Sequence, residues 1–252
     1  MLAAKLVAAL GIWFHPDTYA ATPVLIPFAI RDAKARKSNN PNGVEEWGSP
    51  NSFGYFRDDN SLVKNLPRTL PIISPLSDIY SGETLGNGFV ASHVWRTTTV
   101  PGDKPVLASR LPETYSFLPN LVWLPAQVSK LTDREGSFTQ IYLQALASKI
   151  YRNVEVPARF KPLVDRIWTR LPVPEGIPAQ GLPDITELNF FQHSQQFVEK
   201  RKASIQSVIT AVDCILKGQA IEKTISSRFT TGLPKVIPPE LQRMRSYLSE
   251  CI

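Results

Sequence analysis

The sequence predicts an α+β protein in which a small strand–loop–strand–helix core lies between an irregular N-terminal region and a helical C-terminal half. Two stretches rich in β-branched and aromatic residues near the middle of the chain predict the strands. Apolar residues that recur every four positions after them predict helices. The 22 prolines, against 13 glycines, indicate many rigid connections between short elements. We therefore expect three regions, residues 1–80, 81–156 and 157–252.

The expected core begins at residues 88–95, GFVASHVW, and returns at residues 117–124, FLPNLVWL. Both stretches have the composition of strands, although a proline interrupts the second. Pro125 favours the start of a helix that runs to about Leu131, because proline is well placed in a first helical turn. The connection between the strands, residues 96–116, is polar and carries three cations, Arg96, Lys104 and Arg110.

Two helices are expected before the core. Residues 2–14 carry an apolar stripe at helical spacing, and the apolar run is too short for a cleaved leader to be the better interpretation. Residues 28–37, FAIRDAKARK, predict a second helix with a basic end. From residue 47 to residue 80 we expect loops and short strands, held on the core by three aromatic side chains, Phe53, Tyr55 and Phe56.

The last hundred residues are predicted to be mainly helical. Apolar stripes at a four-residue repeat predict helices around residues 138–150 and 160–168. A proline- and glycine-rich linker at residues 171–183 separates them from a long helix expected over residues 188–217. The final helix is expected to start near Pro239.

Composition narrows the class of partner. The net charge of +6 and a pI near 9.3 favour anionic partners, with nucleic acid first and an acidic membrane surface second. No stretch approaches the roughly 18–20 apolar residues of a membrane span, so we expect a soluble protein without a membrane partner. Cys214 and Cys251 are far apart and form no CxxC motif, which argues against a paired-cysteine zinc site and favours a reducing, cytoplasmic setting.

The segment around His93 carries a recognisable motif. Ser92-His93-Val94-Trp95 is followed by Asn120-Leu121-Val122-Trp123-Leu124-Pro125 and then by Leu131-Thr132-Asp133. In these three pieces, which span about 48 residues, the chain resembles the HNH, or ββα-metal, nucleases. The resemblance implies a small ββα-metal core and a hydrolase that cuts phosphodiester bonds in DNA.

The resemblance also assigns roles to individual residues. His93 would be the general base, and Asn120 would orient its imidazole by a hydrogen bond across the hairpin. Asp133 would hold a single Mg²⁺ or Mn²⁺ ion, both of which prefer oxygen ligands. The cations Arg96, Lys104 and Arg110 would contact the phosphates of duplex DNA. Such nucleases usually occur in restriction, defence or mobile-element settings, and a homodimer or larger complex is compatible with this interpretation.

One position departs from the family pattern. The residue before the base is normally a metal ligand, and here it is Ser92. Either another carboxylate (Asp103, Glu113 or Glu135) completes the site, or the site is inactive. The alternative is therefore a non-catalytic nucleic-acid-binding or assembly subunit on a degenerate ββα scaffold, with His93 as a hydrogen-bonded core residue.

Other candidates are weaker. Asp58 and Asp59 could bind a metal ion, but their polar surroundings are typical of a solvated turn. His193 is expected to be exposed at a helix start. The basic runs at residues 31–37 and 200–202 would be flanking phosphate contacts or merely solvated helix faces.

Overall fold

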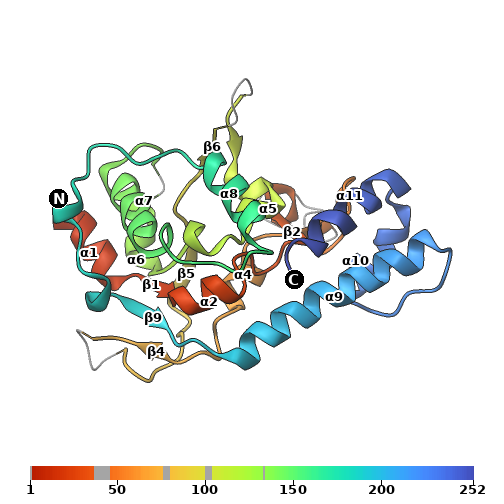
Figure 1. Ribbon diagram of the computed structural model, residues 1–252, viewed down its shortest axis with the longest axis horizontal. Coiled ribbons are helices and arrows are strands. Elements are labelled where there is room, and N and C mark those ends of the chain that lie inside the picture. The colour runs from red at the N-terminus through yellow and green to blue at the C-terminus, as the bar shows by residue number, and fades with distance from the viewer. Residues whose placement is uncertain (1, 37–45, 76–79, 100–103, 133) are drawn as a thin grey trace.

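The computed structural model describes residues 2–36, 46–75, 80–99, 104–132 and 134–252, and it confirms a mixed α and β architecture (Figure 1). Its largest sheet has five strands in the order β4-β9-β1-β8-β5. Two short ribbons stand beside it, β2 with β3 and β6 with β7. The strands are β1 (Ile12–Phe14), β2 (Ala29–Arg31), β3 (Phe56–Asp58), β4 (Ile72–Ile73), β5 (Phe89–His93), β6 (Thr97–Thr98), β7 (Val106–Leu107), β8 (Leu121–Pro125) and β9 (Asn189–Phe191).

Helices pack around this sheet, with α1 against α7 on one side and α9 against α11 at the far end of the molecule (Figure 1). The α-helices are α1 (Leu2–Leu10), α2 (Pro16–Ala21), α4 (Ser61–Asn65), α5 (Pro112–Tyr115), α6 (Ala126–Ser129), α7 (Phe138–Tyr151), α8 (Lys161–Arg170), α9 (Gln195–Leu216), α10 (Ser227–Gly232) and α11 (Pro238–Ser249). Short 3-10 turns are η1 (Ala33–Ala35), η2 (Ala108–Arg110), η3 (Leu118–Asn120), η4 (Lys130–Thr132), η5 (Ala179–Gly181), η6 (Ile185–Glu187) and η7 (Leu233–Lys235).

The two strands expected around residues 88–95 and 117–124 pair with each other. β5 and β8 are antiparallel, with Ala91 opposite Trp123 and His93 opposite Leu121. β8 also pairs with β1, and β1 pairs in parallel with β9. Leu121 through Leu124 are fully buried, because β8 has neighbours on both edges and side chains on both faces.

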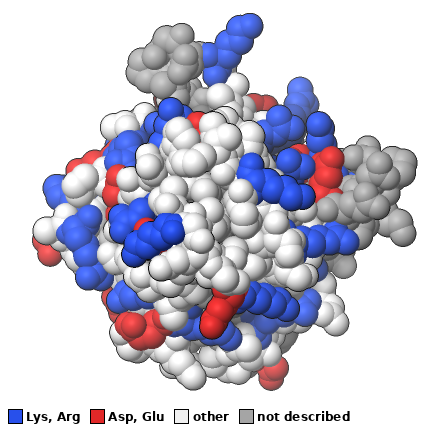
Figure 2. Space-filling model, turned by 90° about the vertical axis from the view of Figure 1, so that its right-hand side faces the viewer, with Lys and Arg blue, Asp and Glu red and all other residues white. Residues whose placement is uncertain are grey.

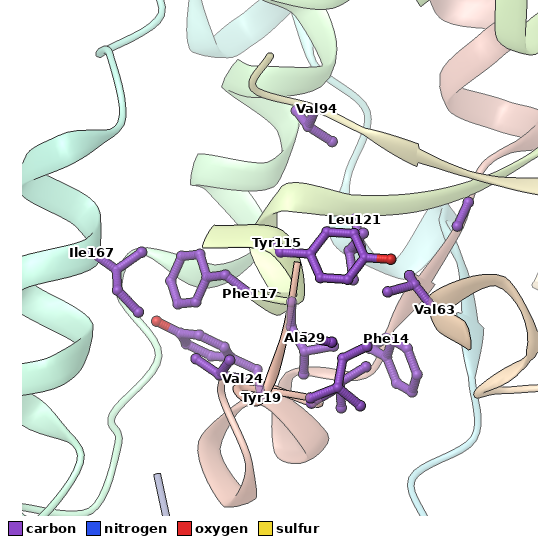
Figure 3. Packing of buried hydrophobic residues seen from close by; sticks show 14 of the residues in the cluster. Phe14, Tyr19, Val24, Ala29, Val63, Val94, Tyr115, Phe117, Leu121 and Ile167 are labelled. Atoms are coloured by element: carbon purple, nitrogen blue, oxygen red, sulfur yellow. The ribbon is translucent and has the colours of Figure 1, made fainter. Parts of the chain in front are cut away.

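All three regions expected from the sequence contribute to this one sheet. Residues 1–80 supply β1 and β4, residues 81–156 supply β5 and β8, and residues 157–252 supply β9. A single apolar core also joins them: in Figure 3, Phe14, Tyr115 and Ile167 belong to the same cluster. The β5–β8 hairpin is therefore one edge of a larger sheet, and α6 after it is only a four-residue helix.

The N-terminal predictions need correction in two places. The first helix ends at Leu10, and the residues after it form β1; moreover it buries Ala4, Val7 and Ala8, whereas Leu2 and Leu6 of the predicted stripe are exposed. Of the helix expected over residues 28–37, the described part (residues 28–36) is not an α-helix, because β2 pairs in parallel with β3 and this long-range pairing overrides the helical propensity of an alanine-rich stretch. Phe53, expected on the core, is 51% exposed.

The C-terminal helices are confirmed at α7, α8 and α11. The long helix is shorter than expected, because residues 189–191 enter the sheet as β9 and Ser194 caps α9, accepting a hydrogen bond from the backbone N–H of Phe197. Residues 171–183 contain only one 3-10 turn, as a linker should. In the described parts of the chain, no helix has both the length and the hydrophobicity that crossing a membrane requires.

Candidate functional site

A cleft of about 640 Å³ opens along strand β5. One wall is the segment that leads into α4, the floor is β5 itself, and the α6–η4 turn closes the other side. The described residues that line it are Arg31, Arg36, Asp59, Asn60, Ser61, Lys64, Val90, Ala91, Ser92, His93, Arg96, Ser129 and Thr132. The cleft thus contains the candidate base His93 and one of the three cations predicted from the loop, Arg96.

Positive charge dominates the cleft. Four of its lining residues are cations and one, Asp59, is an acid. Arg96 reaches Glu135 at 3.8 Å, whereas no carboxylate of the described residues lies within 4.0 Å of Arg36 or Lys64. On the face drawn in Figure 2, blue and red residues are interspersed. A concave site lined by one sign of charge concentrates ligands of the opposite sign, so this cleft suits an anion.

The position of His93 is determined by Tyr115. Nε2 of His93 lies 3.0 Å from the carbonyl oxygen of Tyr115, and the two rings stack at 5.5 Å with planes 21° apart. A carbonyl only accepts hydrogen bonds, so Nε2 must carry the proton and Nδ1 keeps its lone pair. Burial, with a smaller effect of the charge on Arg31, lowers the pKa of His93 from 6.5 to about 4. The imidazole is therefore neutral at pH 7, in the form that can accept a proton.

Asn120 does not orient His93, and that part of the prediction is wrong. Its Oδ1 accepts a hydrogen bond from the Trp95 backbone N–H at 2.7 Å, and its Nδ2 donates to the Thr114 carbonyl at 2.9 Å. Asn120 is fully buried, and these contacts tie the end of β5 to α5. The orienting acceptor is the Tyr115 carbonyl instead, which no spacing rule identifies.

The described residues do not test the prediction that Asp133 holds a metal ion. Asp133 and Asp103 lie outside them, and no group of three or more His, Cys, Asp or Glu side chains within them could hold a metal ion. Glu113 is buried and accepts a hydrogen bond from Arg170, so it cannot swing into the cleft. Glu135 accepts a hydrogen bond from Thr97 at the rim. The cleft itself offers Asp59, and one carboxylate suits Mg²⁺ only when substrate phosphates and water complete its shell.

The other predicted DNA contacts lie outside the cleft. Arg110 lines a neighbouring hollow of about 350 Å³, which also contains Arg31 and Lys34. Lys104 is exposed just before β7 and lines neither the cleft nor this hollow. The structure thus brings Arg96 to His93 and separates Lys104 from it.

The sequence did not predict which residues lie opposite His93 in the cleft. Asp58, expected in a solvated turn, is fully buried: its Oδ2 accepts the Tyr115 hydroxyl at 2.5 Å, and its carboxylate accepts the Leu62 backbone N–H at 3.0 Å. Burial raises the pKa of Asp58. In Figure 3 the Tyr115 hydroxyl is directed toward Val63 of α4. Asp58 therefore joins α4, on one wall, to the residue that holds the histidine on the floor.

Asn60 makes a second link across the cleft. Its backbone is left-handed, with φ of 85°, and its Nδ2 donates to the Ala91 carbonyl on β5 at 2.9 Å. Left-handed backbone is uncommon outside glycine and best tolerated by asparagine, so a polar Asp-Asp-Asn run was the one available signal. His193, expected to be exposed, is half-buried, with Nδ1 3.0 Å from the Thr18 hydroxyl.

Comparison with protein-family models, with curated proteins and with solved structures found no match to this chain.

Proposed function

We propose that this chain binds duplex DNA through its phosphates in the His93 cleft and hydrolyses a phosphodiester bond there, as a metal-dependent endonuclease of the HNH type. The observation that carries the proposal is the pairing of an oriented, neutral imidazole with four cations in one cleft. Phosphodiester hydrolysis needs a base for the attacking water and positive charge for the oxygens of the transition state. Both requirements are met by residues of this cleft.

In the proposed reaction, Nδ1 of His93 accepts a proton from the water that attacks phosphorus. The bond from phosphorus to one ester oxygen breaks, and the departing oxygen takes a proton from a water molecule and leaves as an alcohol. The hydroxide so formed takes the proton from His93, which restores the neutral base. Arg31, Arg36, Lys64 and Arg96 line the space where the phosphate oxygens would lie. A divalent metal ion held by Asp133, as the family resemblance implies, would supply further positive charge to the phosphoryl group.

The low pKa of His93 also fits an anionic substrate. A base of pKa near 4 is weaker than the ideal at neutral pH, and part of the lowering comes from the charge on Arg31. A bound phosphodiester would offset the charge of Arg31 and so oppose that part of the lowering, while burial, the larger cause, would remain.

The second candidate function is nucleic-acid binding without catalysis. Ser92, in place of the family's usual metal ligand, lines the cleft and favours this alternative. The two functions share the basic cleft and differ only in whether His93 acts on a water molecule. One preparation therefore distinguishes them if binding and cleavage are measured together.

The test is plasmid nicking with Mg²⁺, Mn²⁺ or EDTA, run beside DNA-binding measurements. We expect nicking with either metal ion and none with EDTA. His93→Ala should lower the cleavage rate about 10²–10⁴-fold and leave DNA affinity nearly unchanged, because a general base acts in the transition state. His193→Ala is the matched control, since it removes a half-buried histidine that does not line the cleft.

Two outcomes would redirect the proposal. DNA binding without metal-dependent nicking in the unaltered protein would leave the non-catalytic alternative. A His93→Ala protein with normal activity per folded molecule and a lower melting temperature would make His93 a structural residue. Asp133→Ala addresses the metal: cleavage that keeps its divalent-ion dependence would remove Asp133 from the ligand set.

A further inference from the structure

A second basic space adjoins the cleft at Arg31. The hollow that contains Arg110 is lined by Ile30, Arg31, Asp32, Lys34, Arg57 and Arg110, so Arg31 lines both spaces. The two spaces, of about 640 and 350 Å³, are therefore neighbours that share Arg31. A ligand that fills both must carry negative charge at more than one point along its length.

Not every cation of the hollow is available to a ligand. Arg57 contacts Glu46 at 3.2 Å and Asp32 at 3.8 Å, which makes it a structural residue of the β2–β3 ribbon. Lys34 and Arg110 are exposed, and among the described residues neither has a carboxylate within 4.0 Å. Positive charge thus continues beyond the cleft, from Lys64 past Arg31 to Arg110.

Backbone groups add uncharged donors to the cleft floor. The Val94 N–H donates to the Asn120 carbonyl, and the Ala126 N–H donates to the Gly88 carbonyl. The backbone N–H and C=O groups of the even-numbered residues in this segment therefore point toward β8. The N–H groups of Ala91 and His93 therefore point away from β8, to the edge where Asn60 bonds the Ala91 carbonyl. Backbone amides and arginines are the groups that contact phosphate oxygens in nucleic-acid complexes.

Aromatic stacking platforms are missing from both spaces. None of the described residues that line them is Phe, Tyr or Trp, and the residues outside the described ranges include no Phe, Tyr or Trp. Among the described residues, the one ring at the cleft is His93, and Tyr115 stacks against it. Proteins that hold single strands stack unpaired bases on aromatic side chains, so unpaired bases would find no such support here.

We infer that the cleft and the hollow form one track for at least two consecutive phosphates of a duplex strand whose bases stay stacked. The inference rests on the proposed function and deepens it: the ligand is recognised by its sugar–phosphate backbone, without unpaired bases and without a defined base sequence. Lys64 marks one end of the track, Arg31 its middle and Arg110 the other end. Hydrolysis takes place at the end that contains His93.

The test measures binding in EDTA, where the proposed cleavage is absent, by fluorescence anisotropy over a series of salt concentrations. The probes are duplexes of about 20 base pairs with unrelated sequences, one duplex with neutral methylphosphonates at every linkage of both strands, and the matching single strand. We expect the duplexes to bind equally within about twofold, because the phosphates are common to all of them. The methylphosphonate duplex and the single strand should bind more weakly.

Variants test the length of the track. Lys64→Ala and Arg110→Ala should each lower the slope of log affinity against log salt by about one, whatever the duplex sequence. Arg228→Ala is the matched control: it removes an exposed arginine of α10 that lines neither space. It should change the slope no more than any distant charge does.

Failure of the inference and failure of the proposed function give different results. Equal salt slopes for Arg110→Ala and Arg228→Ala would show that the bound phosphates do not extend from the cleft to Arg110. Single strands that bind as tightly as duplexes would overturn the exclusion of unpaired bases. A strong preference for one duplex sequence would overturn backbone recognition. No binding to any probe at low salt would instead reject the proposed function itself.

Discussion

Arginines at the C-terminal end of the molecule and cations in the cleft have different partners. Arg166 contacts Glu113 and Glu250, Arg170 contacts Glu113, and Arg245 contacts Asp213 at 2.6 Å. In the cleft, four cations are accompanied by a single lining acid, Asp59. Each of these arginines has a carboxylate partner, whereas Arg36 and Lys64 of the cleft have no carboxylate within 4.0 Å among the described residues.

The two regions should lose different amounts of stability when a charge is removed, and Glu113 should give the larger loss. Glu113→Gln leaves the Arg170 guanidinium without its carboxylate and weakens the contact of Arg166. Because both arginines are partly exposed, we expect a loss of about 2 kcal/mol in the free energy of unfolding. Urea unfolding measures it. The control is Glu135→Gln at the cleft rim, where an exposed pair should contribute no more than about 0.5 kcal/mol. Equal losses would contradict the distinction between the regions.

The histidine of the cleft should make stability depend on pH. The folded pKa of His93 is about 4 against 6.5 in the unfolded chain, so between these values the unfolded state binds the extra proton. Stability therefore falls as the pH falls from about 6.5 to 4, by at most about 3 kcal/mol and by less because the ring borders solvent. Denaturant unfolding of the protein and of His93→Gln over this range isolates the effect. Parallel curves for the two proteins would show that His93 does not titrate this way.

Two buried tyrosines sharpen the comparison between the cleft and the core. Tyr115→Phe removes one of the two hydroxyls that donate to the Asp58 carboxylate, and Tyr151→Phe removes a hydroxyl that donates to the Phe14 carbonyl at 2.6 Å. Each should cost about 1–2 kcal/mol of stability. Only Tyr115→Phe should also slow plasmid nicking and move the NMR signals of the His93 ring, because it alone supports the histidine. The same response to both substitutions would remove Asp58 and Tyr115 from the site.

Removal of a cleft cation should have the smallest effect on folding. Lys64→Gln deletes a charge without an ion-pair partner among the described residues and keeps the backbone carbonyl that accepts the Trp123 indole N–H. We expect a change within about 0.5 kcal/mol in the thermal stability, together with weaker DNA binding. A large loss of stability would mean that Lys64 stabilises the fold, and its charge would no longer support a DNA-binding role for the cleft.

Local patterns predicted the elements that depend on local forces. The four-residue apolar repeat located α7 and α8, and the β-branched stretches located β5 and β8, because helix periodicity and strand composition are properties of neighbouring residues. The prediction that His93 lies in a strand beside a site also followed from local composition and from the motif around it. Its role as a base remains a prediction.

Only the tertiary structure decided what faces His93. Arg31, Arg36 and Lys64 are between about 30 and 60 residues away in sequence, and they reach the cleft because β2 pairs with β3 and Asn60 bonds β5. The β2–β3 pairing turned an expected basic helix into a strand and a 3-10 turn, and separate pairings with β1 and β4 brought residues 189–191 into the five-stranded sheet.

Asp58 shows most clearly why the sequence alone did not predict how the cleft is built. By sequence it is one acid in a polar run, and only the fold reveals that it is buried beneath Tyr115 with hydrogen bonds to the first turn of α4. Burial of a carboxylate is costly unless donors surround it, and those donors come from residues up to 57 positions apart. Composition and periodicity therefore determined the kinds of element and the sign of the charge. The long-range hydrogen bonds decided where that charge forms a site.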